Sequence, residues 1–417
     1  MRHWLPPVAP VVALVVALLA AWLAVVCAGG ARADQPSADG GVSPFYTWTG
    51  DVPAQPGTML RTEPLDPARG LPNAGRQMRI LYTSTNGIDG KTPIVVSGML
   101  FLPKGDPPPG GWKLVAWAHG TTGLADICAP SWIGLSARDR EYLGTLLAQG
   151  WAIVATDYQG LGTAGLHPYL LTRPEANSVL DSIRAVRGDR FGIANQVVVA
   201  GQSQGGGAAV ATAGFAPEYA PDIDVKGTVA TGVPYITRAV LRTPPTGSDP
   251  KKPNRTFAYY LYIALTAPLA DPHVTAEDLI TEKARPALAH AATACIWDMF
   301  RIVTADGLNT ANGLMPEYGK AFASVLPAME YTTLALKQPV FIGTGTDDHD
   351  VPPALQLLLA RQACAAGTVV QAHLYQGLNH SETVNASLAD SLPFMRKVFA
   401  GDPITPACAP EPQPPAR

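Results

Sequence analysis

Val199-Ala200-Gly201-Gln202-Ser203-Gln204-Gly205 is the stretch of sequence on which the fold depends. It follows the apolar run 197–200 and precedes the small residues 206–213, so it predicts a strand, a tight turn and a helix. Gly201 and Gly205 leave room for the strand and the helix to cross, and the strained turn exposes the Ser203 hydroxyl above the helix N-terminus. We predict a nucleophile elbow with Ser203 as the nucleophile. The alternative is a plain glycine-rich turn.

The N-terminus has the pattern of an export signal. Arg2 and His3 precede an uncharged apolar stretch at residues 8–28, and Ala31-Arg32-Ala33 places small residues where a signal peptidase reads them. The stretch is also long enough to be an uncleaved membrane anchor, but the Ala-x-Ala site favours cleavage. We therefore predict a signal peptide at residues 1–33, cleavage after Ala33, and a secreted or periplasmic protein.

Charge and cysteine content narrow the class of protein. The formal net charge is −3, and positive and negative residues are scattered along the chain. This charge pattern does not indicate a basic surface for nucleic acid, so no nucleic-acid partner is expected. An even number of cysteines after the signal peptide suggests two disulfides, with three possible pairings. No cysteine pair has the spacing of zinc ligands, so no metal site is expected. These cysteines are Cys128, Cys295, Cys364 and Cys408.

Short apolar runs alternate with helical stretches along most of the chain, which predicts an α/β fold with a mostly parallel central sheet and helices on both faces. The predicted strands cover residues 79–84, 94–101, 113–118, 152–156, 197–200, 228–232, 340–343 and 369–375. The predicted helices include residues 138–148, 175–187 and 353–366.

The alternation of strands and helices breaks between about Pro234 and Pro339, where a loop rich in Pro, Lys and Asn is followed by an aromatic run and helical material. We predict that this insertion is a cap over the active site. The alternative is a surface pair of helices with no gating role. The predicted parts are a signal peptide (1–33), the core (34–233 and 339–408), the cap (234–338) and a disordered Pro-rich tail (409–417).

His380 is the predicted general base. A serine nucleophile needs a base within hydrogen-bond reach and an acid that orients the base. When the serine lies on an elbow, the acid and then the histidine follow it on loops after later strands. His380 lies just past the run that ends at Tyr375, whereas His373 lies inside that run and is expected to pack on the sheet.

Three carboxylates follow the run at 340–343 and compete to orient His380. They are Asp347, Asp348 and Asp350. Asp347 or Asp350 could instead cap the following helix, whose first turn favours negative charge.

Two backbone N–H groups are predicted to stabilise a tetrahedral oxyanion. One belongs to Gln204, the residue after the nucleophile. The other belongs to Thr121, in the turn His119-Gly120-Thr121-Thr122-Gly123 that follows the strand at 113–118. His119 is then a structural histidine. The segment 157–162 either lines the pocket or packs at its rim.

Taken together and in order, these motifs resemble the secretory lipase family of α/β hydrolases over residues 58–408. The motifs that carry the resemblance are Cys128-Ala129-Pro130-Ser131, Asp157-Tyr158-Gln159-Gly160-Leu161-Gly162, Gly201-Gln202-Ser203-Gln204-Gly205-Gly206, the Gly345, Asp348, Val351 and Pro352 set, and the Gly377 and His380 pair. The resemblance implies a triad of Ser203, Asp348 and His380, and it is the reason for preferring Asp348. It also implies a cap domain and the disulfides Cys128–Cys295 and Cys364–Cys408. The typical fungal member carries an acidic residue near the position of Thr121, and this chain does not.

We therefore expect an exported serine hydrolase that cleaves carboxylic esters through an acyl-enzyme. Its substrate would be a small-molecule or lipid ester, a lipid–water interface is one place where it could act, and no cofactor is needed. A secreted serine peptidase of the same fold would need paired acids on the cap, for which Glu277, Asp278 and Glu282 are the candidates. A non-enzymatic binding module of this fold normally lacks one member of the triad.

Overall fold

In the computed structural model, Met1, residues 39–238 and residues 251–413 are described. Apart from Met1, the predicted signal peptide and its cleavage site after Ala33 lie outside these ranges. The chain divides after Ser37 into two units, and every element named below belongs to the second. Within the described ranges, no helix has the length and apolar character needed to cross a membrane.

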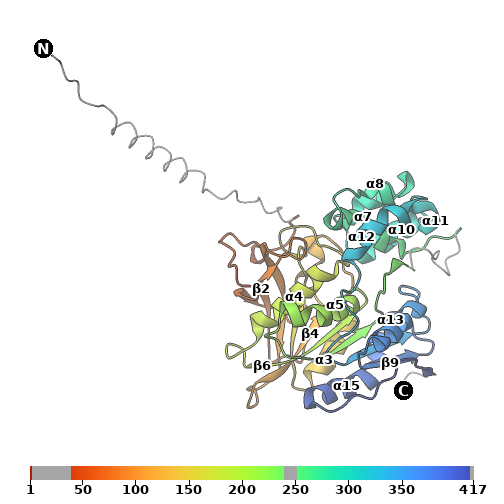
Figure 1. The fold of residues 1–417 in the computed structure, drawn as a ribbon. Coiled ribbons are helices and arrows are strands. Elements are labelled where there is room, and N and C mark those ends of the chain that lie inside the picture. The colour runs from red at the N-terminus through yellow and green to blue at the C-terminus, as the bar shows by residue number, and fades with distance from the viewer. Residues whose placement is uncertain (2–38, 239–250, 414–417) are drawn as a thin grey trace. The chain divides into compact units, whose positions relative to one another are not determined.

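A mostly parallel sheet of ten strands runs through the second unit (Figure 1). The strands are β1 (Met59–Pro64), β2 (Arg76–Thr85), β3 (Pro93–Leu102), β4 (Trp112–Ala118), β5 (Ala152–Thr156), β6 (Ile193–Gln202), β7 (Val225–Thr231), β8 (Val340–Gly345), β9 (Val370–Tyr375) and β10 (Pro412–Gln413). Their order in the sheet is β1-β2-β3-β5-β4-β6-β7-β8-β9-β10. The pairs up to β3–β5 are antiparallel and all later pairs are parallel, so the predicted fold class is confirmed.

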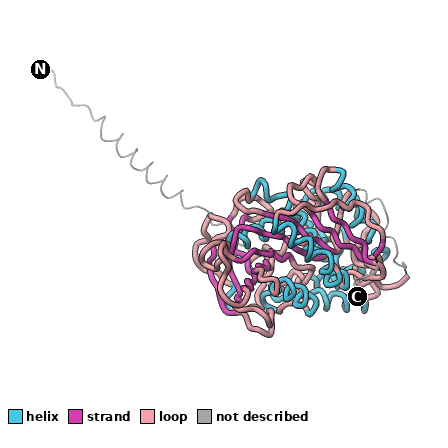
Figure 2. Tube along the Cα trace, turned by 90° about the horizontal axis from the view of Figure 1, so that it is seen from below, coloured by secondary structure: helices cyan, strands magenta, loops and turns pink. Residues whose placement is uncertain are grey.

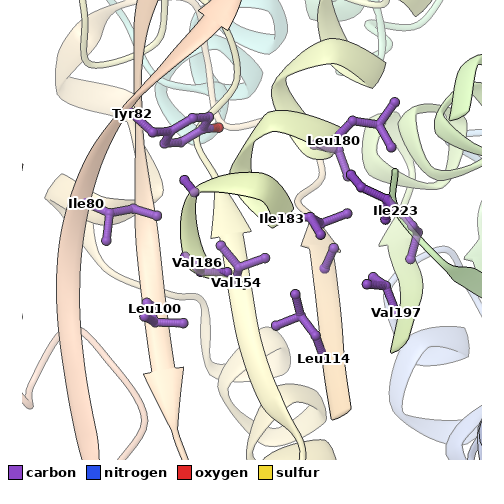
Figure 3. Close-up of a cluster of buried hydrophobic side chains, with 14 of the residues drawn as sticks. Ile80, Tyr82, Leu100, Leu114, Val154, Leu180, Ile183, Val186, Val197 and Ile223 are labelled. Atoms are coloured by element: carbon purple, nitrogen blue, oxygen red, sulfur yellow. The ribbon is translucent and has the colours of Figure 1, made fainter. Parts of the chain in front are cut away.

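Helices cover both faces of the sheet (Figures 1 and 2). The side chains of β4 alternate between the faces, as those of a strand must. Leu114 joins the hydrophobic cluster under α4 (Thr172–Val186) and α5 (Gln204–Tyr219), whereas Val115 joins the cluster under α3 (Ala137–Leu147) and α15 (Leu388–Ala400). Figure 3 shows Leu180 and Ile183 of α4 in the first cluster. The bounds of the main core helices are α3 (Ala137–Leu147), α4 (Thr172–Val186), α5 (Gln204–Tyr219), α13 (Pro353–Ala365) and α15 (Leu388–Ala400).

Between β7 and β8 the chain forms a group of helices, which we call the helical insertion (residues 251–338; Figure 1). These helices are α7 (Phe257–Ala270), α8 (Ala276–Leu279), α9 (Arg285–Ala291), α10 (Ile296–Ala305), α11 (Thr310–Gly313) and α12 (Tyr318–Val325). The helical insertion has a hydrophobic cluster of its own, centred on side chains such as Leu261 and Met299. Tyr169 and Leu171, which precede α4, also belong to this cluster, so the helical insertion packs on the loop between β5 and α4.

Two disulfides join distant segments, and they are the pairs that the family resemblance implies. Cys128–Cys295 connects the segment after β4 to the start of α10, with 5.5 Å between the Cα atoms. Ile296 N–H donates to Thr122 O at 2.8 Å beside this bridge. Cys364–Cys408 connects the end of α13 to the C-terminal segment.

β10 departs from the prediction of a disordered tail at residues 409–417. Pro412 and Gln413 pair in parallel with Leu374 and Tyr375 of β9, and Gln376 N–H donates to Gln413 O at 2.8 Å. The reason is that β9 offers unpaired backbone groups at the edge of the sheet, and the disulfide at Cys408 holds the tail beside them. Residues 414–417 lie outside the described ranges.

Removing the bridge between core and helical insertion should destabilise the protein. The bridge joins residues separated by 167 positions, so its loss restores much conformational entropy to the unfolded chain. The double variant Cys128→Ala/Cys295→Ala should lose about 2–4 kcal/mol of unfolding free energy in urea titrations. Cys364→Ala/Cys408→Ala, which opens a loop of 44 positions, is the matched comparison and should lose less. An unchanged urea midpoint without the first bridge would contradict this account.

Candidate active site

Ser203 lies on a sharp turn between β6 and α5. Its backbone has φ 58° and ψ −123°, a left-handed conformation that a non-glycine residue adopts only when its surroundings hold it there. Its N–H donates to Thr231 O at 2.9 Å, which ties the turn to the end of β7. The side chain therefore stands at the carboxyl edge of the sheet, in front of the N-terminus of α5.

The turn is possible only because its flanking residues lack side chains. A Cβ atom on Gly201 would lie 2.0 Å from Gly205 O, and a Cβ atom on Gly205 would lie 1.9 Å from Ala118 O. Both distances are far inside van der Waals contact, so α5 can cross β4 and β6 this closely only because both positions are glycine. This is the steric arrangement that the sequence predicts for a nucleophile elbow.

Asp348 and His380 form a buried pair after β8 and β9. His380 Nδ1 lies 2.7 Å from Asp348 Oδ2. The other oxygen of Asp348 accepts from the N–H groups of Asp350 and Val351 at 3.0 and 2.8 Å, and Oδ2 also accepts from Gln356 Nε2 at 2.9 Å. These four bonds fix the plane of the carboxylate and thereby the orientation of the imidazole ring.

The competing groups on the acid loop lie elsewhere. The side chain of Asp347 is exposed and accepts from Thr346 Oγ1 at 3.1 Å, and His349 is also exposed. Asp350 forms an ion pair with Arg255 at 2.7 Å. Neither Asp347 nor Asp350 caps α13, whose N-cap is Pro352.

His380 packs against the end of β7. A Cβ atom on Gly232 would lie 2.6 Å from His380 Cε1, so the imidazole occupies the space of the missing side chain. Because Asp348 accepts from Nδ1–H, the lone pair of His380 is on Nε2. This nitrogen is buried and has no hydrogen-bond partner in the described part of the chain. Sequence reasoning missed both Gly232 and Gln356, since neither belongs to a motif with a known spacing.

The predicted oxyanion turn passes directly over the elbow. A Cβ atom on Gly120 would lie 2.6 Å from Gln202 Oε1 and 3.5 Å from Ser203 Cβ. Thr121, the next residue, has its hydroxyl 2.7 Å from the hydroxyl of Tyr169. The Gln204 N–H is the first of α5, where no helical carbonyl is available to accept it.

A buried polar layer supports this turn from below. His119 Nδ1 lies 2.7 Å from Gly120 O, and burial lowers the pKa of this histidine. The Asp157 carboxylate accepts from the hydroxyls of Ser97 and Ser131, and burial raises the pKa of Asp157. Tyr158 donates to His119 O at 2.9 Å. His119 is thus a packing residue, and Asp157 and Tyr158 of the segment 157–162 are fully buried beneath the turn.

A second buried polar group involves the side chain of Gln204. Its Nε2 lies 2.8 Å from His167 Nε2 and 2.8 Å from Glu175 Oε1. Burial lowers the pKa of His167 to about 4 and raises that of Glu175 to about 8, so both side chains are neutral at pH 7. No pattern in the sequence marks His167, and Glu175 appears there only as the first residue of the predicted helix 175–187.

In the described residues, no cluster of three or more His, Cys, Asp and Glu side chains could hold a metal ion.

The doubly covered, mostly parallel sheet and the serine elbow define the α/β hydrolase fold. The secretory lipase family model matches residues 136–406. The chain therefore belongs to the secretory lipase family, and it is a carboxylic ester hydrolase.

Individual relatives agree with this membership. A secreted triacylglycerol lipase of Malassezia furfur is 24% identical over 86% of this chain and 79% of its own length. A probable inactive lipase of Mycobacterium tuberculosis is 29% identical over 45% of this chain and 44% of its own. Among solved structures, Candida antarctica lipase A in its closed state superposes with a TM-score of 0.70 at 21% identity and covers 89% of both chains.

Filling the space at Gly232 should displace His380. In Gly232→Ala, the new methyl group would collide with the imidazole ring, so kcat/KM on an ester should fall roughly 10- to 100-fold. Gly307→Ala is a matched control, because Gly307 has φ +63° against +61° for Gly232 but no atom within 4 Å of its Cβ position. If both variants lose the same activity, backbone strain and not the position of His380 is responsible.

The buried Glu175 should make stability depend on pH. Its pKa is about 8 in the folded protein against 4.5 when exposed. Its contribution is therefore complete below pH 4.5, decreases as the pH rises, and is lost once the pH passes about 8. From pH 5 to pH 8.5 the wild type should lose on the order of 3 kcal/mol more unfolding free energy than Glu175→Gln. Urea titrations at both pH values measure this difference, and parallel losses would refute the assignment.

Proposed function

We propose that this protein is an exported serine hydrolase that cleaves carboxylic esters through an acyl-enzyme intermediate. The observation that carries the proposal is that an elbow serine and an oriented histidine both lie at the end of β7. Ser203 is held in a strained turn at the sheet edge, and the His380–Asp348 pair stands against Gly232, one residue from the carbonyl that binds Ser203.

In the first half of the reaction, Ser203 Oγ attacks the carbonyl carbon of the ester while His380 Nε2 takes the hydroxyl proton. Asp348 stabilises the imidazolium that results and keeps the ring in the required tautomer. The carbonyl oxygen becomes an oxyanion, and the backbone N–H groups of Gln204 and Thr121 donate to it.

In the second half, the tetrahedral intermediate collapses and the C–O bond to the alcohol breaks. His380 gives its proton to the departing alcohol, which leaves an acyl group on Ser203. A water molecule then attacks this acyl-enzyme with His380 as the base, and the acid is released. Each step uses protein groups alone, so the proposal invokes no cofactor.

We further propose that residues 234–338 are a cap that encloses the substrate, with 34–233 and 339–408 as the core. The cluster of the helical insertion includes Tyr169 and Leu124, which flank the oxyanion turn. Arg255, just before α7, forms an ion pair with Asp350 of the acid loop, and burial, with the charge of Asp350, raises the pKa of Tyr259 of α7. These contacts favour a cap over a detached surface helix pair.

The proposed substrate is a small-molecule or lipid ester, which a lipid–water interface could present. The Malassezia furfur relative, named as a triacylglycerol lipase, supports a lipid substrate. Family membership and the two disulfides support export, and we propose that export uses a signal peptide cleaved after Ala33.

The peptidase alternative has less support. Glu277, Asp278 and Glu282 are all exposed. Asp278 is used in a capping box with Thr275, and Glu282 pairs loosely with Arg285 at 3.8 Å. These acids do not form a buried pair that could hold a free amino group.

Replacing the nucleophile tests the proposal directly. Ser203→Ala should lower kcat on p-nitrophenyl esters by roughly four to six orders of magnitude and abolish labelling by a fluorophosphonate. Ser182→Ala removes a buried hydroxyl that donates within α4, at 2.7 Å to Val179 O, and should leave both readings unchanged. A Ser203→Ala variant that keeps more than a few per cent of the activity would exclude Ser203 as the nucleophile. Chain lengths from acetate to palmitate would also reveal the acyl preference.

A further inference from the structure

Side chains from the loop between β5 and α4 and from the first turn of α4 contact both residues whose N–H groups would bind the oxyanion. We propose that His167, Tyr169 and Glu175 are positioning residues that fix the donors Gln204 and Thr121 for the transition state. We call these three side chains the oxyanion clamp. The inference rests on the proposed function, because it assigns a role to residues around that same site.

His167 and Glu175 together fix the Gln204 side chain. Glu175 Oε1 also accepts the Leu170 N–H at 3.1 Å, so it is an acceptor toward the Gln204 amide. His167 Nδ1 lies 3.0 Å from Gln159 O and must donate to it, which leaves His167 Nε2 as an acceptor. Both hydrogens of the Gln204 amide nitrogen are therefore used, each at 2.8 Å.

Burial makes this arrangement specific. Gln204 and Glu175 are each 2% exposed, and His167 is 1% exposed, so water does not compete for their polar atoms. Any rotation of the Gln204 side chain would leave a buried donor unpaired, at a free-energy cost. The side chain thus resists movement of the backbone unit that carries the proposed oxyanion donor.

Glu175 also fastens the loop itself. Leu170, whose N–H it accepts, has φ 59° and is one of three non-glycine residues with positive φ among the described residues, together with Tyr158 and Ser203. One carboxyl oxygen therefore connects the strained bend of the loop to the strained elbow. Strain of this kind persists only where several interactions enforce it.

Tyr169 makes the second connection, to the oxyanion turn. Its hydroxyl lies 2.7 Å from Thr121 Oγ1, and the residue is 3% exposed. The ring packs edge-on against Tyr262 of α7, with 5.6 Å between centroids, and against His167 at 6.3 Å. Tyr169 is thereby held from the helical insertion on one side and from the Gln204 network on the other.

The function of such a clamp follows from the requirement that oxyanion donors be fixed before charge develops. Neither donor lies in the interior of a helix or strand, where hydrogen bonds on both sides would hold its backbone. Gln204 begins a helix, where hydrogen bonding from the backbone is incomplete, and Thr121 lies in an irregular turn. The clamp supplies, from one loop and the first turn of α4, the rigidity that the backbone alone does not provide.

The test compares variants that remove single connections while leaving the proposed triad and the donor N–H groups in place. Gln204→Met and Glu175→Leu break the Gln204 connection, and Tyr169→Phe breaks the Thr121 connection. Glu175→Gln keeps an acceptor oxygen and should largely rescue Glu175→Leu. Tyr262→Phe and Thr212→Val are matched controls, since their hydroxyls bond to Ala294 O and Ala208 O, away from both donors.

Three readings separate positioning from general structural damage. A fluorophosphonate titration gives the concentration of competent sites, and kcat and KM for a p-nitrophenyl ester are then expressed per site. Ki for an alkylboronic acid, which forms a tetrahedral adduct with the serine, reports the affinity of the oxyanion site. The three clamp-breaking variants should lose roughly 10- to 100-fold in kcat with KM nearly unchanged, and Ki should rise by a similar factor.

The possible results point to different conclusions. If kcat per site and boronate Ki stay within about twofold of wild type in the clamp-breaking variants, the clamp is an ordinary packing network and the inference is wrong. A loss confined to KM, or an equal loss in Tyr262→Phe, would also overturn it. If the wild type itself neither labels nor turns over esters, the proposed function fails and the inference fails with it.

Discussion

The close backbone contact at the elbow is the constraint on which the site depends. At the elbow, Gly205 lies against the carbonyl of Ala118, and Gly201 lies against the carbonyl of Gly205. This contact sets α5 across the ends of β4 and β6, and so determines where Ser203 stands relative to the oxyanion turn that continues from β4. Gly120 meets Gln202 and Ser203 for the same reason. A side chain at any of these glycines would separate the proposed nucleophile from the groups proposed to act with it.

The features that the sequence predicted share a physical basis: each depends on local pattern or on chain order. The strands were identifiable because buried parallel strands are continuous apolar runs, such as 197–200. His380 was identifiable because it directly follows one of them. The choice of Asp348 over Asp347 and Asp350 came from family resemblance alone, and the structure gives a geometric reason, since only Asp348 has an oxygen 2.7 Å from the imidazole.

The features that sequence reasoning missed depend on contacts between residues far apart in the chain. Gln204 meets Glu175, 29 positions away, and His167, 37 positions away. Gly232 receives the ring of His380. Glutamine, glycine and glutamate occur throughout the chain, and neither periodicity nor spacing marks these particular ones.

The sequence analysis also missed two edge strands, because their composition is not that of a buried strand. β1 contains Arg61 and Glu63, and β10 begins with proline.

The helical insertion reaches the site at two places, and these contacts differ in strength. Arg255 pairs with Asp350 beside the acid loop, but the arginine side chain is 46% exposed, and a pair screened by water contributes little. In the contact through Tyr262 and Tyr169 to Thr121, both tyrosines are buried and Thr121 is half-buried, and the Cys128–Cys295 bridge lies beside the same turn. The helical insertion is therefore held most firmly on the oxyanion side. If it moves to admit substrate, the acid side is where separation costs least free energy, and the proposed oxyanion donors would keep their positions while it does.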